Sequence, residues 1–431
     1  MNIHTIKSNP LVRRIVHGSF WNLFGNTFSK AIVLLSSIIV AHIIGKNQYG
    51  EYSIIRTTIF MFIALASVGV GATSTKYIAE YRDTNPQKAY IVYKVTSLFS
   101  ILFGIIVTIV VIYSSDYIAI RQLNTPNLSI VLKYGAILLF FCTINGAQAG
   151  ALAGFEGFKE IAKNSLISSI IELIAIVILT VYFGLIGAII GSGVSYVILA
   201  LFNHICIRKY FTLHSCNRSS KLKLSDFRVI LDFGLPAALC NLIVIYALWY
   251  TRTYLVRYSG FGDIAIYNAA DQVKSFILFI PTALAQIILP ILTNLKANGS
   301  KNSYIKVLYS NIILNILIAS VLSLIICLLS PLILSLWGKD FIEPLPLILL
   351  SISTIFTAFA TVVGQAIASH GKMWIGFICN LIWALLVVIL SIKFINHGMG
   401  ATGLALSILI AYFLHGLYQF VYLKYLLKTR I

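Results

Sequence analysis

Seven ionisable side chains interrupt long apolar segments of this sequence, and their chemistry is the first thing to explain. They are Lys30, Arg56, Lys133, Glu172, Arg252, Asp271 and Lys274. A charge at the centre of a bilayer is costly, so it normally faces a water-filled cavity or an opposite charge. Lysine and arginine are receptors for anions, whereas a buried carboxylate can carry a proton or a sodium ion. The pattern favours anion or ion binding inside a membrane over covalent catalysis.

Lys30 is the deepest of these charges within its own apolar segment. It shares one helical stripe with five smaller polar residues, namely Ser19, Asn22, Asn26, Ser29 and Ser37. Such a stripe is the face of a helix that looks at water or at a polar substrate. We therefore interpret Lys30 as a functional residue, with Asn22 and Asn26 lining the same cavity.

The remaining charges each have more than one interpretation. Arg56, Arg252 and Lys274 lie nearer the outer ends of their segments, where long side chains can extend to lipid headgroups. Asp271 has two candidate partners: Lys274, three residues further along the same helix face, and Arg252 on the preceding segment. Glu172 is the carboxylate well inside the first half of the chain, which makes it a candidate for proton or sodium coupling.

The composition places these charges on membrane-spanning helices. Hydrophobic residues make up 59% of the 431 residues and charged residues 10%, against about a quarter charged in a soluble domain. Continuously apolar runs of about twenty residues recur, which fits helices and excludes the alternating strands of a β-barrel. We predict an all-α integral membrane protein with about twelve transmembrane helices. The approximate spans are 18–44, 53–80, 90–115, 129–155, 164–184, 186–208, 230–258, 264–294, 304–329, 344–369, 373–394 and 400–425.

The basic residues between these spans predict the orientation. Lysine and arginine concentrate in alternate loops and at both chain ends, for example Arg13 and Arg14, Lys159 and Lys163, and Lys428. The positive-inside rule then places both termini in the cytoplasm. The formal net charge of +19 follows from loops that face anionic headgroups and needs no nucleic-acid partner. Lys133 begins its span and is interpreted as an interfacial anchor.

Neither a cofactor nor a metal is indicated by the sequence. The six cysteines are scattered and suggest neither a disulfide framework nor a zinc site. There is no phosphate-binding loop. The first apolar run, from about Phe20 to Gly45, is too long for a signal-peptide core, so we expect it to be a retained helix.

Two halves of the chain resemble each other at a spacing of 213–215 residues. The matched landmarks are Gly45, Tyr52 and Ser53 with Gly260, Tyr267 and Asn268; Gly150 and Gly157 with Gly364 and Gly371; and Gly187-Ala188 with Gly400-Ala401. Equivalent ends of both copies face the same side, which indicates a parallel repeat with a central cavity between the lobes. We predict an N-terminal six-helix lobe over residues 1–210, a basic cytoplasmic linker over 211–228 and a C-terminal six-helix lobe over 229–431.

These landmarks also carry a family resemblance. The residues concerned are Gly45, Tyr49-Gly50-Glu51-Tyr52, Gly69-Val70-Gly71-Ala72, and the lobe ends Gly150 to Lys163, Gly184 to Gly191, Gly364 to Lys372 and Gly398 to Gly403. The chain resembles, over nearly its whole length, the bacterial polysaccharide flippases of the multidrug/oligosaccharidyl-lipid/polysaccharide exporter superfamily. Multidrug extruders of that superfamily usually have a carboxylate in the first helix, whereas this chain has Lys30.

The resemblance implies a non-enzymatic function in the bacterial cytoplasmic (inner) membrane. Such a protein moves an undecaprenyl-diphosphate-linked oligosaccharide to the outer leaflet by alternating access, for O-antigen, lipopolysaccharide or related surface polysaccharides. Its partners would be this lipid-linked oligosaccharide, membrane lipids and other polysaccharide assembly proteins. We expect four cations to receive the diphosphate, with Asp271 as polar lining; they are Lys30, Arg56, Arg252 and Lys274.

Two other classes of function were weighed against this one. A membrane enzyme would need acid, base or metal-binding residues on a surface loop, and every loop here is short. An ion-coupled multidrug or small-solute exporter of the same superfamily is the closer alternative, and a carboxylate essential for coupling would support it.

Overall fold

The computed structural model describes residues 10–67, 69–213, 235–297 and 299–429. Every regular element in these ranges is helical. Most of the predicted basic linker, residues 214–228, lies outside the described part of the chain. The chain forms two compact units, Met1–Ile43 with Ile55–Leu242, and Ile44–Ile54 with Ile243–Ile431.

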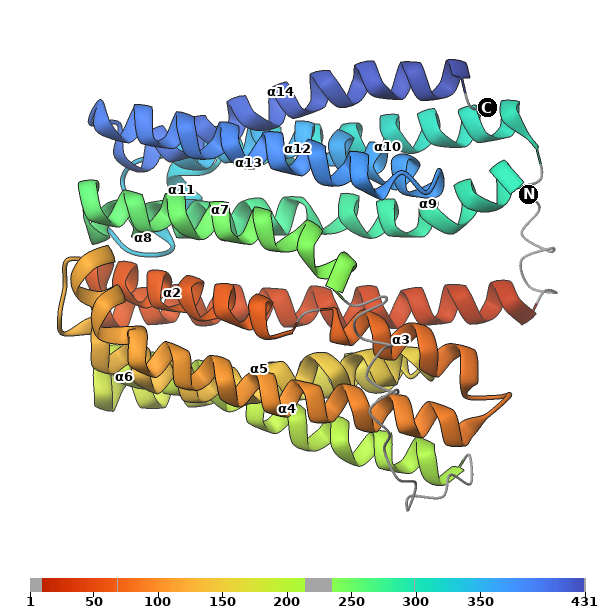
Figure 1. Cartoon of the computed structure of the whole chain (residues 1–431). Helices are drawn as coiled ribbons and strands as arrows, with labels where there is room; N and C mark the ends of the chain where they lie inside the picture. Colours follow the sequence, from red (N-terminus) through yellow and green to blue (C-terminus); the bar gives the residue numbers. More distant parts are fainter. Residues whose placement is uncertain (1–9, 68, 214–234, 298, 430–431) are drawn as a thin grey trace. The chain divides into compact units, whose positions relative to one another are not determined.

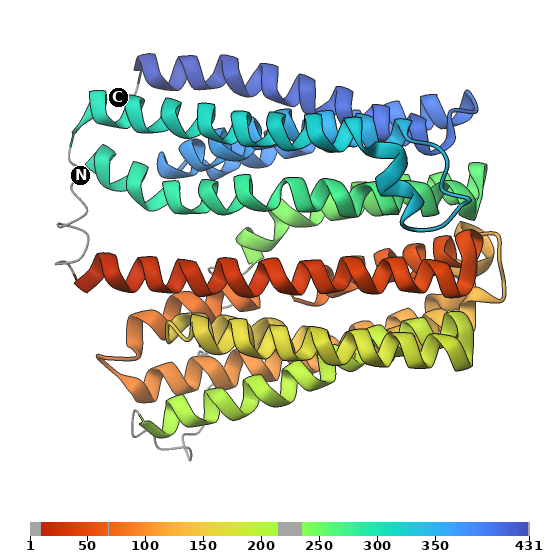
Figure 2. The same cartoon turned by 180° about the vertical axis from the view of Figure 1, so that it is seen from behind.

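The first unit is built mainly from α2 to α6. Their bounds are α2 (Pro10–Ala66), α3 (Val70–Tyr81), α4 (Pro86–Tyr117), the π-helical turn η1 (Ile118–Gln122), α5 (Leu128–Gly154) and α6 (Phe158–Leu213). Helix α5 packs against α3, α4 and α6, and α4, α5 and α6 lie side by side in both views (Figures 1 and 2).

The second unit contains the helices from α7 onward. Their bounds are α7 (Leu235–Ser259), α8 (Phe261–Ile277), α9 (Phe279–Ala297), α10 (Lys301–Leu328), α11 (Ser330–Ser335), α12 (Leu345–Ser369), α13 (Met373–Asn396) and α14 (Gly400–Thr429). Helix α12 is central, because it packs against α8, α9, α10 and α14.

Eight of the described helices are long and apolar enough to cross a membrane. Two of them merge spans that the sequence predicts separately, because the helix reverses at a glycine. Gly45 inside α2 has φ 77° and Gly184 inside α6 has φ 56°, a region that residues with a Cβ rarely adopt. Dividing α2 and α6 at these glycines, and joining α2 to α3 and α8 to α9, gives the twelve predicted segments.

Positive φ angles recur at equivalent positions in the two halves of the chain. The pairs are Gly45 (φ 77°) with Gly260 (φ 89°), Asn124 (φ 53°) with Gly338 (φ 137°), Glu156 (φ 60°) with Gly371 (φ 69°), and Gly184 (φ 56°) with Gly398 (φ 78°). Each pair is separated by 214 or 215 residues. Turns of the same kind at the same spacing are what two copies of one helical unit produce. The exact lobe boundaries at 210 and 229 stay a prediction.

Two predicted helices are wrong in one respect, because each is broken near its middle. The span 53–80 is interrupted where Gly69 adopts φ 61° before α3. The span 264–294 is interrupted at Leu278, between α8 and α9. Pro281 explains the second break, since proline has no N–H to donate to the carbonyl four residues earlier, at Ile277.

Helices α3 and α5 approach each other through two glycines. A Cβ on Gly150 would overlap the backbone of Gly71, and Thr75 Oγ1 donates to the carbonyl oxygen of Gly150 at 3.1 Å. Small residues at a helix crossing allow this kind of backbone contact inside a membrane. One turn earlier, a Cβ on Gly146 would meet, among the residues that the structure describes, only the Ser67 hydroxyl, at 3.9 Å.

Arg82 joins the ends of the same two helices. Its guanidinium donates to the Gly154 carbonyl at 2.8 Å and to Glu156 at 2.5 Å. Burial disfavours the charge of Arg82, but Glu156 and Asp83 outweigh burial and raise its pKa above the ordinary value. Arg82 therefore fixes the end of α3 to the end of α5.

We predict that Gly150→Ala destabilises the protein and Gly146→Ala does not. The added methyl at 150 must push α3 away from α5, which costs about 1–3 kcal/mol in a packed core. At 146 the same methyl has room, and alanine gains up to about 1 kcal/mol of helix propensity. Thermal unfolding of both purified variants in detergent tests this. Equal midpoints for the two variants would contradict the close packing of α3 on α5.

Candidate functional site

Three of the predicted charges form one buried cluster in the second unit. Asp271 Oδ2 accepts a hydrogen bond from the Arg252 guanidinium at 2.7 Å, and Asp271 Oδ1 lies 3.5 Å from Lys274 Nζ. The side chains are 14%, 22% and 11% exposed for Arg252, Asp271 and Lys274. The sequence left open which cation pairs with Asp271; the structure shows that both do.

The α7–α8 hairpin brings these residues to similar depth. Gly260 turns the chain between the two helices, and Arg252 lies eight residues before it. Asp271 lies eleven residues after it, so both are about 12–16 Å from the turn at a rise of 1.5 Å per residue. Lys274 follows Asp271 on the same face of α8.

Two tyrosines form the aromatic surroundings of the cluster. The Arg252 guanidinium lies 5.4 Å from the ring centre of Tyr267, which is fully buried one turn before Asp271. The Lys274 ammonium lies 5.6 Å from the ring of Tyr412 on α14. Both distances allow cation–π attraction. From the sequence, Tyr267 is recognisable only as a landmark of the repeat. Tyr412 carries no signal, because its partner Lys274 is far away in sequence.

The cluster suits electrostatic binding better than catalysis. Two cations share one carboxylate, which leaves a net charge of +1 on the three side chains. An excess positive charge in a poorly solvated place attracts an anion more strongly than it would in water. Within the described residues there is no group of three His, Cys, Asp or Glu side chains that could hold a metal ion.

The first unit has a second charged site around Glu172. This carboxylate is 7% exposed on the first arm of α6. It lies in the electrostatic range of Arg56 and within hydrogen-bonding reach of Ser195, whose hydroxyl also donates to the Ser192 carbonyl at 3.0 Å. Glu172 lies twelve residues before the turn at Gly184, and Ser195 lies eleven residues after it. The α6 hairpin therefore places the two residues at nearly the same distance from its turn. Ser195 was not predicted.

Arg56 comes from α2 and its guanidinium also lies 5.7 Å from the ring of Phe60. Its interpretation as a headgroup-seeking side chain is less favoured, since Arg56 is partly buried and faces Glu172.

The other predicted site residues are not brought to either cluster by a described contact. Lys30 is exposed on α2 in the first unit. The side chains of Asn22 and Asn26 lie outside the described residues, so the polar stripe around Lys30 stays a prediction. Lys133 pairs with Asp116 at 3.2 Å near the surface, in keeping with an anchor. A shared diphosphate site formed by Lys30, Arg56, Arg252 and Lys274 also stays a prediction.

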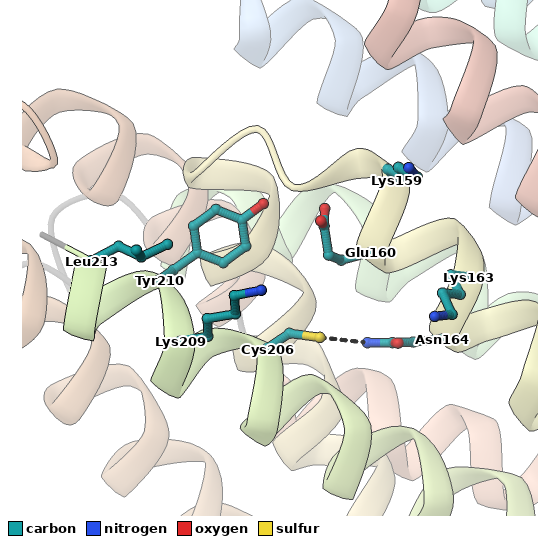
Figure 3. A pocket seen from close by; sticks show the side chains of 8 residues that line it. All are labelled: Lys159, Glu160, Lys163, Asn164, Cys206, Lys209, Tyr210 and Leu213. Carbon is teal, nitrogen blue, oxygen red and sulfur yellow. Dashed lines mark hydrogen bonds between the residues drawn. The ribbon is translucent and has the colours of Figure 1, made fainter.

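A basic hollow of about 440 Å³ lies in the first unit at the open end of the α6 hairpin (Figure 3). Its lining residues are Lys159, Glu160, Lys163, Asn164, Cys206, Lys209, Tyr210 and Leu213. In the sequence, Lys159 and Lys163 indicate only the orientation of the chain. Lys209 lies 46 residues after Lys163 and 50 after Lys159, and the reversal of α6 at Gly184 brings it close to them.

The fold is similar to that of solved multi-helix membrane transporters. An inward-facing multidrug resistance MATE family transporter of the MOP superfamily superposes with a TM-score of 0.76, at 17% identity over 93% of this chain and 96% of that one. A MOP superfamily transporter from Pyrococcus furiosus gives a TM-score of 0.71, at 18% identity over 96% of this chain and 95% of that one. At these identities the likeness establishes the fold.

The family follows from the sequence itself. Residues 15–296 match the family described as polysaccharide biosynthesis protein. This chain belongs to that family. A candidate O-antigen transporter of Shigella flexneri is 24% identical over 83% of this chain and 85% of its own length. An uncharacterized membrane protein of Methanocaldococcus jannaschii is 24% identical over 94% of this chain and 98% of its own. The predicted resemblance to a polysaccharide family is confirmed, and the fold is similar to that of solved transporters of the MOP superfamily.

We predict that Asp271 contributes more to stability than Lys274. Asp271→Asn leaves two neighbouring buried cations uncompensated and should cost about 3–5 kcal/mol. Lys274→Met leaves the neutral Arg252–Asp271 pair and should cost about 1 kcal/mol or less, since an isosteric apolar side chain replaces a costly buried charge. Unfolding midpoints in detergent measure both.

The double variant Asp271→Asn with Lys274→Met provides the control for this prediction. Removing the second cation should restore part of the stability lost in Asp271→Asn, because the repulsion between Arg252 and Lys274 disappears. Additive losses in the double variant would show that the two cations do not share the carboxylate.

Proposed function

We propose that this protein flips an undecaprenyl-diphosphate-linked oligosaccharide from the cytoplasmic to the outer leaflet, for the synthesis of a surface polysaccharide such as an O-antigen. The observation that carries the proposal is the buried Arg252–Asp271–Lys274 cluster with its net positive charge. Two further findings support the proposal: the chain belongs to the polysaccharide biosynthesis family, and one relative is described as a candidate O-antigen transporter.

A diphosphate is the anion that this arrangement suits. It concentrates negative charge on a few oxygens, and arginine and lysine bind such oxygens through charge-assisted hydrogen bonds. Because Asp271 already holds both cations in place, little side-chain ordering remains to be done when the anion arrives. We assign Arg252 and Lys274 to the diphosphate, with Lys30 and Arg56 as further ligands and Asp271, Asn22 and Asn26 as polar lining.

Alternating access is the proposed mode of movement. Transporters of this fold have been solved in inward-facing and outward-facing conformations. In two-lobed transporters, rocking of the lobes exposes a site near the bilayer midplane to each side in turn. We place the protein in the bacterial inner membrane with both termini in the cytoplasm, where it would work beside other polysaccharide assembly proteins.

Glu172 favours a second candidate, an ion-coupled exporter of multidrug or small-solute type. A buried carboxylate beside a hydroxyl and an arginine is a suitable site for a proton that moves with the transport cycle. The same group would serve equally well to couple a flippase to an ion gradient. We therefore treat Glu172 as a candidate coupling residue in either case.

We predict that Lys274→Met and Lys30→Ala each slow the flipping of a lipid-linked oligosaccharide in proteoliposomes. Losing a hydrogen bond to a charged group costs about 1.5–3 kcal/mol, which is about tenfold or more in rate. Wild type and variants are reconstituted at matched protein content, and access of the glycan to an external glycosidase reports flipping.

Lys133→Ala is the matched control, since it removes a lysine that is 41% exposed and paired with Asp116 near the surface. It should flip at the wild-type rate. Normal flipping by Lys274→Met would remove the buried cluster from the substrate site, and normal flipping by Lys30→Ala would make Lys30 structural. If the wild-type protein does not move this lipid but expels cationic dyes, the result would support the multidrug-exporter alternative.

We predict that Glu172→Gln abolishes the response of flipping to a pH gradient while leaving the rate without a gradient within about twofold. The amide keeps the shape and hydrogen-bonding reach of the side chain but cannot exchange a proton. Flipping is measured with and without an imposed gradient. The exposed Asp340→Asn is the control and should respond as the wild type does. An unchanged response in Glu172→Gln would exclude this residue from coupling.

A further inference from the structure

We propose that the basic hollow of the first unit binds the phosphate of an anionic membrane phospholipid, of the phosphatidylglycerol type. This site is separate from the buried cluster and does not depend on what the protein transports. Its walls are the beginning and the end of α6, and Figure 3 shows Lys163 and Lys209 reaching into it from opposite arms of that hairpin, with Lys159 at the rim.

The charges of the hollow point to an anion. Three lysines and one glutamate line it, which gives a net charge of +2. In the described part of the chain neither Lys163 nor Lys209 forms a salt bridge. Glu160 faces the Tyr210 hydroxyl across the hollow. The two ammonium groups therefore remain available for a ligand from outside the chain.

The floor of the hollow is held in place before any ligand binds. Asn164 donates to Asn203 Oδ1 at 3.0 Å and to Cys206 Sγ at 3.6 Å, so the two arms of α6 are joined directly beneath the lysines. Tyr210 stacks on Phe155 with ring centres 5.2 Å apart. A preformed concavity of this size, close to 440 Å³, fits a small phosphoglycerol headgroup and lowers the entropic cost of binding it.

The apolar surface next to the lysines identifies the ligand as a lipid rather than a free anion. On the second arm of α6, Leu201, Ile205 and Leu213 are 57%, 63% and 69% exposed, and Lys209 lies at the same four-residue spacing. Residues four apart share one face of a helix. This face is thus a lipid-facing stripe that carries a lysine near its end.

The first arm repeats the pattern. Ile170, Ile174 and Ile178 are 43%, 55% and 50% exposed, and Lys163 precedes them on the same helical face. Each arm therefore offers exposed aliphatic side chains for acyl chains and a lysine at the headgroup end. By the positive-inside pattern this end faces the cytoplasmic leaflet, where anionic lipids are attracted by about 1 kcal/mol per nearby basic residue.

Native mass spectrometry of the purified full-length protein tests the site directly. Dioleoyl phosphatidylglycerol is titrated against dioleoyl phosphatidylcholine, which has the same acyl chains but no net charge. We expect preferential retention of phosphatidylglycerol by the wild type. The triple variant Lys159→Gln, Lys163→Gln and Lys209→Gln should weaken it about tenfold or more, given three lost headgroup contacts.

Three exposed lysines of the second unit supply a control with the same change in charge. The variant Lys296→Gln, Lys301→Gln and Lys306→Gln should bind phosphatidylglycerol within about twofold of wild type. The triple arginine variant Lys159→Arg, Lys163→Arg and Lys209→Arg keeps the charge and should retain binding, which separates loss of the site from loss of the fold.

Three results would overturn the proposal. The first is wild-type lipid binding by the pocket glutamine variant, and the second is an equal loss in the control variant, which would reduce the effect to overall charge. The third is displacement of the lipid by glycerol 1-phosphate at concentrations comparable to those of the lipid, which would make the hollow a site for a soluble phosphate. None of these results depends on transport, so failure here leaves the flippase proposal untouched.

Discussion

The cost of an unpaired charge in hydrocarbon is the constraint on which the arrangement of this protein depends. A chain with 10% charged residues can place few of them inside the bilayer, and each needs a partner or water. In the second unit, Asp271 meets that need for both Arg252 and Lys274. The pairing stabilises the α7–α8 hairpin and at the same time leaves one positive charge in excess. The structural pairing and the proposed binding site therefore involve the same three side chains.

Equivalent positions in the two halves of the internal repeat carry charged residues of opposite sign. Arg56 and Asp271 each lie eleven residues after a positive-φ glycine, at Gly45 and Gly260, and are 215 residues apart. Arg56 acts on Glu172 in the first unit, and Asp271 binds cations in the second. Equivalent positions thus carry opposite charges with complementary partners. We infer that both copies of the repeat have a charged residue at this position. The sign of the charge and its partner differ between the two halves.

Features governed by local chemistry could be predicted from the sequence, and features governed by long-range contacts could not. The apolar runs gave the helices, and the glycine landmarks marked the turns that recur in both halves. Both candidate partners of Asp271 were identified because one is three residues away and the other lies on the adjoining helix. Tyr412 and Ser195 were missed because only the folded chain brings them near. The break at Leu278 is also a matter of local chemistry, because the missing N–H of Pro281 weakens the helix one turn earlier.

The positive charges of this protein differ in their surroundings according to their depth in the protein. At the ends of α6, Lys163 and Lys209 are exposed and share helical faces with exposed aliphatic side chains, where water and headgroups still screen them. Lys274 is buried against Tyr412 and Asp271, where screening is weak and each interaction is stronger. The same residue type would therefore attract lipid weakly and reversibly at the surface and would attract an anion more strongly in the interior. In a protein that moves a lipid-linked anion, this difference between surface and interior would concentrate anionic lipids at one leaflet. The stronger interior site would then be reserved for a ligand whose anionic group leaves the headgroup region and enters the protein.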